Sequence, residues 1–70
     1  MSLLDDREPE LQTQVLAKIF EKEISGEITE ERGSEICRMI DDERDEYYHN
    51  KISYEELEKR LLAIIKKELG

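Results

Sequence analysis

The chain has 70 residues and a formal net charge of −8 at pH 7, and 43% of its residues are charged. A chain of this length has room for one domain with a small core, which usually gains stability from disulfides, a metal or self-association. Surfaces for nucleic acid or anionic membranes require clustered Lys and Arg, so the acidic balance argues against both. We therefore expect neither nucleic acid nor a membrane as a partner.

The cysteine and histidine content limits how the domain can be stabilised. The chain has one cysteine, Cys37, and one histidine, His49, so neither a disulfide nor a structural metal site is expected within one chain. No apolar run approaches the roughly 20 residues of a membrane span, and MSLLDDREPE lacks the layout of a signal peptide. We expect a cytoplasmic protein that binds no cofactor and keeps Cys37 as a reduced thiol.

Helix start and stop signals divide the chain into three helices. Pro9 suits the first turn of a helix, and Gly26 can take the left-handed conformation that closes one. Thr29 and Ser53 are expected N-caps because each precedes a pair of glutamates and an apolar-periodic segment. The predicted helices span residues 9–24, 29–48 and 53–69, after a flexible leader at residues 1–8.

The apolar residues recur with the helical period, and their faces are wider than one core stripe requires. In the third helix they cover an arc of roughly 160°, whereas a surface helix typically needs about 100° or somewhat more. Residues 9–70 are therefore predicted to form one all-α domain, a small three-helix antiparallel bundle that assembles as a two-fold homodimer. The residues expected at the contact between copies are Leu16, Phe20, Leu62 and Leu69.

Two stretches share an isoleucine, a hydroxyl residue and paired glutamates: ISGEITEE at 24–31 and NKISYEEL at 50–57. Each overlaps a 12-residue stretch that resembles part of a calcium loop, counted from Glu21 and from Asp45. Arg32 occupies the twelfth place of the first stretch, and Tyr47 occupies the third place of the second. Two helix starts explain the repeat better. Ser53, with a glutamate three residues later, has the spacing of a capping box. No calcium site is expected.

The second copy of this pattern has a family resemblance. ISYEELEKRLL at 52–62 resembles the short two-helix modules at the C-terminal ends of many bacterial proteins, and this resemblance implies oligomerisation. ITEERGSEICR at 28–38 departs from the pattern, because Gly33 replaces an apolar residue. No Ser/His/Asp order appears, and the carboxylates lie on helix faces, so no enzyme activity and no catalytic residues are expected. The favoured function is a self-associating protein–protein interaction module.

The predicted second helix is strongly acidic. Its carboxylates form either a solvated face or a surface for a basic protein. Asp45-Glu46-Tyr47-Tyr48 resembles small acidic helical immunity proteins that block bacterial nucleases, with His49 in place of their proline. The resemblance implies an alternative function, an inhibitor or antitoxin-like protein that binds a basic enzyme surface. The residues expected to carry it are Asp41, Asp42, Asp45, Glu46 and Tyr48.

Two further residue sets have alternative readings. Glu46 and His49 have the Glu-x-x-His spacing of di-iron carboxylate proteins. One such motif is half a site, which a second chain would have to complete, so a histidine placed favourably at a helix end is the preferred reading. Cys37 has only Arg38 beside it to lower its pKa, so we expect a small buried apolar side chain.

Overall fold

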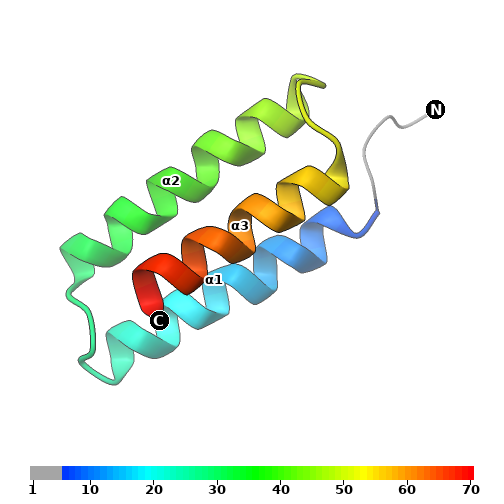
Figure 1. Cartoon of the computed structure of the whole chain (residues 1–70). Helices are drawn as coiled ribbons and strands as arrows, with labels where there is room; N and C mark the ends of the chain where they lie inside the picture. The colour runs from blue at the N-terminus through cyan, green and yellow to red at the C-terminus, as the bar shows by residue number, and fades with distance from the viewer. Residues whose placement is uncertain (1–5) are drawn as a thin grey trace.

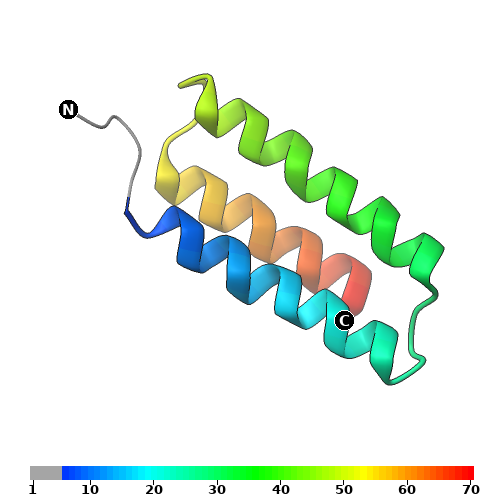
Figure 2. The same ribbon diagram turned by 180° about the vertical axis from the view of Figure 1, so that it is seen from behind.

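Three antiparallel helices form the protein in the computed structural model, which describes residues 6–70 (Figure 1). They are α1 (Glu8–Ile24), α2 (Glu30–Tyr48) and α3 (Tyr54–Leu69). The start of α1 lies at the end of the bundle where α2 connects to α3, and the C-terminus lies near the opposite end (Figures 1 and 2). The predicted all-α three-helix bundle is confirmed. Most of the expected leader, residues 1–5, lies outside the described part of the chain.

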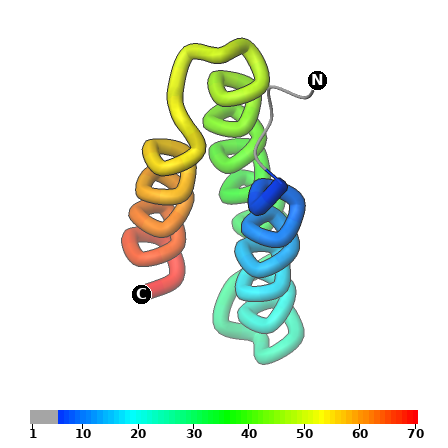
Figure 3. The backbone as a smooth tube through the Cα atoms, turned by 90° about the vertical axis from the view of Figure 1, so that its right-hand side faces the viewer, coloured from blue at the N-terminus to red at the C-terminus, as the bar shows by residue number. Residues whose placement is uncertain are grey.

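The core consists of one apolar stripe from each helix. The stripe of α1 follows a spacing of four residues, which places its side chains on one side of the helix. Each large apolar side chain that is fully buried contributes about 1.5–3 kcal/mol to folding. Figure 3 shows the three helices lying along one another, so the stripes meet between them. The buried residues are Leu11, Val15, Ile19, Ile36, Ile40, Tyr47, Tyr54, Leu57 and Leu61.

The two predicted N-caps are present. The Thr29 hydroxyl accepts a hydrogen bond from the Arg32 backbone N–H at 3.1 Å, and the Ser53 hydroxyl accepts one from the Glu56 N–H at 3.1 Å. The return bond expected for a capping box is absent, however. The Glu56 carboxylate instead accepts from Arg60 Nε at 3.0 Å, because a charge-assisted hydrogen bond is stronger than one from a neutral backbone N–H.

Short turns connect α1 to α2 and α2 to α3. Gly26 has φ 82°, as expected for a residue that ends a helix, and Asn50 has φ 60° after α2. Asparagine is among the few non-glycine residues that adopt this left-handed conformation readily. Residues 25–29 and 49–53 are therefore enough to reverse the chain, so that α2 runs antiparallel to α1 and to α3 (Figure 1).

The first helix begins at Glu8, inside the segment expected to be a leader. Pro9 lies in its first turn, as predicted. Glu8 is only 3% exposed, and its carboxylate accepts a hydrogen bond from Arg44 Nε on α2 at 2.9 Å. This ion pair fixes the start of α1 against α2, which explains why the helix extends to Glu8.

Replacing Ser53 with Ala is expected to lower the free energy of unfolding by about 1 kcal/mol, because the Glu56 N–H loses its acceptor at the start of α3. Urea denaturation measures the change. Ser34→Ala is the matched control, since Ser34 lies exposed inside α2 and should not lose stability. Equal free energies for Ser53→Ala and the unchanged protein would show that this cap contributes nothing.

Candidate interaction surfaces

One side of α1 carries apolar residues that the core leaves uncovered. Leu16, Phe20 and Ile24 follow each other at a spacing of four residues, so they lie along one side of the helix. Leu16 is partly buried against the core, but Phe20 is 54% exposed and Ile24 is 87% exposed. The wide apolar face of α1 therefore divides into a buried stripe and an exposed stripe.

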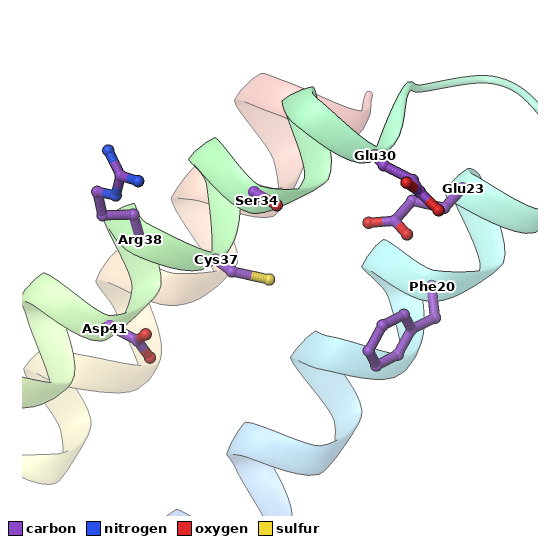
Figure 4. Close-up of a pocket in the computed structure, with 7 residues that line it drawn as sticks. All are labelled: Phe20, Glu23, Glu30, Ser34, Cys37, Arg38 and Asp41. Atoms are coloured by element: carbon purple, nitrogen blue, oxygen red, sulfur yellow. The ribbon is translucent and has the colours of Figure 1, made fainter.

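A groove of about 460 Å³ lies between α1 and α2 beside this exposed stripe. Figure 4 shows Phe20 and Cys37 extending into it from opposite walls, whereas the guanidinium of Arg38 points away from α1. Phe20 and Cys37 thus make part of each wall apolar. We call this space the α1/α2 groove. The lining residues are Phe20, Glu23, Glu30, Ser34, Cys37, Arg38 and Asp41.

The α1/α2 groove has an acidic rim. Glu23, Glu30 and Asp41 supply three carboxylates, against the single cation of Arg38. The pKa of the Cys37 thiol is raised. Burial is the largest cause, and the nearby carboxylates of Asp41 and Glu23 raise the pKa further. Cys37 is half-buried: it packs against the edge of the core and also lines the groove, so it is less buried than the sequence suggested.

Gly33 allows one of these carboxylates to approach α2 closely. Gly33 is buried, and a side chain there would collide with the carboxylate of Glu23. Glu23 therefore lies against the N-terminal part of α2, where the helix dipole favours a negative charge. A side chain at residue 33 would therefore displace the Glu23 carboxylate from its place against α2.

Arg44 closes the other end of the seam between α1 and α2. Besides Glu8, its guanidinium donates to the Tyr48 hydroxyl at 3.1 Å and to Asp41 Oδ1 at 3.3 Å. Burial alone would lower the pKa of Arg44, but its hydrogen bonds to Glu8 and Tyr48 outweigh burial, and the pKa is raised. Arg44 therefore stays charged and holds both Asp41 and Tyr48.

A second apolar surface lies on the outer side of α3. Leu62 is 49% exposed, whereas its neighbour Leu61 is fully buried, so Leu62 lies outside the monomer core. Lys59 and Lys66 are exposed and lie three residues before and four residues after Leu62, which places them beside it. We call Lys59, Leu62, Ile65, Lys66 and Leu69 the α3 surface.

The α3 surface borders the seam between α3 and α1. Ile65 and Leu69 are partly buried against the core and line a groove of about 310 Å³, together with Lys18, Glu21 and Lys22 of α1. This seam therefore carries charges of both signs, whereas carboxylates predominate at the α1/α2 groove. The four residues expected at one contact belong to two surfaces, with Leu16 and Phe20 on one side of α1 and Leu62 and Leu69 near the other.

The five residues expected to bind a basic protein do not form one compact patch. They spread over roughly 160° of the surface of α2 at 100° per residue. Asp41 and Tyr48 contact Arg44. Glu46 pairs with Lys51 at 3.7 Å, and Asp45 lies 3.5 Å from His49 Nδ1. Asp42 is exposed.

The helices also rule out the two calcium loops weighed from the sequence. Glu21 and Glu23 belong to α1, and Asp45 and Tyr47 belong to α2, so neither 12-residue stretch is a loop. Across residues 6–70, no three or more His, Cys, Asp or Glu side chains are grouped so that they could hold a metal ion. Within the same residues, none of the helices combines the length and apolar character needed to cross a membrane.

No protein-family model, curated protein or solved structure matches the chain. The function is therefore inferred from the two surfaces themselves. Sequence reasoning missed the roles of Cys37, Glu23 and Glu30 in the α1/α2 groove. For the α3 surface a signal was available, because lysines at the third position before and the fourth position after Leu62 share its side of the helix.

A double variant, with Glu23→Gln and Asp41→Asn together, is expected to have a lower pKa at Cys37, because both carboxylates raise that pKa. A lower pKa increases the thiolate fraction at pH 8, so Cys37 should react faster with iodoacetamide. Asp42→Asn on the outer side of α2 is the matched control and should leave the rate unchanged. Identical rates for all three proteins would mean that the groove carboxylates do not act on the thiol.

Proposed function

We propose that this chain is a small acidic protein–protein interaction module that associates with further copies of itself. One observation supports it most: large apolar side chains remain exposed on a bundle whose helices already share a well-buried core, namely Phe20, Ile24 and Leu62. Exposed apolar surface of this kind, bordered by charged residues, is typical of protein interaction sites. Association would remove it from water.

The small size of the domain favours self-association for a second reason. Domains below about 70–80 residues rarely obtain enough stability from one core and usually need an additional constraint. The chain has a single cysteine and cannot form a disulfide within itself. A contact that only folded copies can make stabilises the folded state by mass action.

We place the protein in the cytoplasm because Cys37 has no second cysteine in the chain to pair with.

A second candidate function is the binding of a basic enzyme surface by α2. Asp42 supports it, because it is exposed and forms no ion pair with any other described residue. It ranks second because Asp41, Tyr48 and Glu46 already contact groups of this chain. A partner bound in this way would be lost from an Asp42→Asn, Asp45→Asn variant whose molar mass in solution is unchanged.

The molar mass in solution tests self-association directly. One chain has a mass of 8.3 kDa. Multi-angle light scattering at micromolar protein concentration should give a larger mass that decreases on dilution. A mass of one chain at every concentration would overturn the proposed function.

Leu62→Glu and Leu61→Glu should separate association from folding. Leu62 is half exposed, so a glutamate there should lower the molar mass and leave most of the helical circular dichroism intact. Leu61 is fully buried, so a glutamate there should unfold the bundle by placing an unpaired charge in its core. Equal loss of helix in both variants, without an effect of Leu62→Glu on mass, would contradict these assignments.

A further inference from the structure

The two apolar surfaces carry opposite charge. The α1/α2 groove has Glu23 and Glu30 at one end, and neither forms an ion pair with another described residue. On α3, Lys59 and Lys66 flank Leu62, and both likewise lack an ion pair within residues 6–70. Glu58 lies four residues before Leu62 on the same side of the helix, so two lysines and one carboxylate border Leu62. A bundle with a net charge of −8 thus presents one apolar site with an acidic rim and one with lysines.

We propose that the α3 surface of one copy docks into the α1/α2 groove of the next. Leu62 would lie against Phe20 and Cys37, and the lysines beside it would face the groove carboxylates. This inference rests on the proposed function and specifies its interface. The docked helix would lie along α1 and α2 of the neighbouring copy as a fourth helix, an arrangement that buries apolar stripes well.

Charge argues against the two symmetric alternatives. Pairing two α1/α2 grooves would bring Glu23 and Glu30 of one copy against the same carboxylates of another, and like charges across an interface cost free energy. Pairing two α3 surfaces would bring Lys59 and Lys66 together with their counterparts. Only the unlike pairing satisfies both sets of charges.

The unlike pairing also determines how the assembly grows. The two surfaces lie on different sides of α1, so one copy can use both at the same time. Such a head-to-tail interface adds further copies until the rotation between neighbours closes a ring, and it grows as an open chain if the rotation does not close. The expected assembly is a ring or an open chain, which differs from the two-fold dimer expected from the sequence.

Mixing two variants tests the pairing. Phe20→Glu removes the apolar groove wall and keeps the α3 surface, whereas Leu62→Glu keeps the groove and removes the apolar side chain that docks in it. Each variant alone should be a monomer that retains its helical circular dichroism, since both positions are exposed. Mixed in equal amounts, they should form a complex of two chains that grows no further, because one intact groove and one intact α3 surface remain.

The outcomes separate this inference from the proposed function. A monomeric unchanged protein overturns both. An unchanged protein that associates, with variants that stay monomeric after mixing, overturns the head-to-tail pairing and leaves self-association standing. A two-fold contact between Phe20 and Leu62 would not be rescued by mixing, because its second half would join two glutamates.

A charge reversal on α3 provides a matched control. On the helix, Lys66 lies about 40° from Leu62 and Lys67 about 140° from it. Lys66→Glu should weaken association about fivefold, by a change near 1 kcal/mol, and raising the salt concentration should reduce that difference. Lys67→Glu should have little effect. Equal effects of the two substitutions would show that the lysine beside Leu62 does not face the groove.

Discussion

Three helices that share a single core can each bury only one stripe of side chains. In α1 that stripe is Leu11, Val15 and Ile19, and every apolar residue beyond it must remain at an edge or in water. Phe20 and Leu62 lie outside the buried stripes for this reason. The exposed apolar surface is therefore a consequence of helix geometry combined with an apolar face that is wider than the core can accept.

Ion pairs at the seams fix how the helices lie against one another. Glu8 and Arg44 join α1 to α2 at one end, where Glu8 is almost fully buried. Glu43 and Arg60, 3.0 Å apart, join α2 to α3. Burying a charge costs free energy unless the charge is paired. The Glu8–Arg44 pair therefore strongly disfavours other arrangements of α1 and α2, in which Glu8 would be buried without its partner. The α1/α2 groove exists because this seam is closed at the Arg44 end and remains open beside Phe20.

Local sequence signals predicted the helices well. The N-caps at Thr29 and Ser53 and the turn at Gly26 depend on neighbouring residues only, so they could be read from the chain. The α1/α2 groove could not, because it depends on how α1 and α2 pack. Glu8 and Arg44 illustrate the limit, since they lie 36 residues apart and nothing in their local sequence links them.

We infer that other copies of the chain cover the surfaces that the bundle leaves exposed. Amide NMR of the unchanged protein over a dilution series measures this. The signals of Phe20 and Cys37 in the groove, and of Leu62 and Lys66 on α3, should shift with one common concentration midpoint, while Val15 in the core should shift little. Spectra that are identical at all concentrations would contradict it.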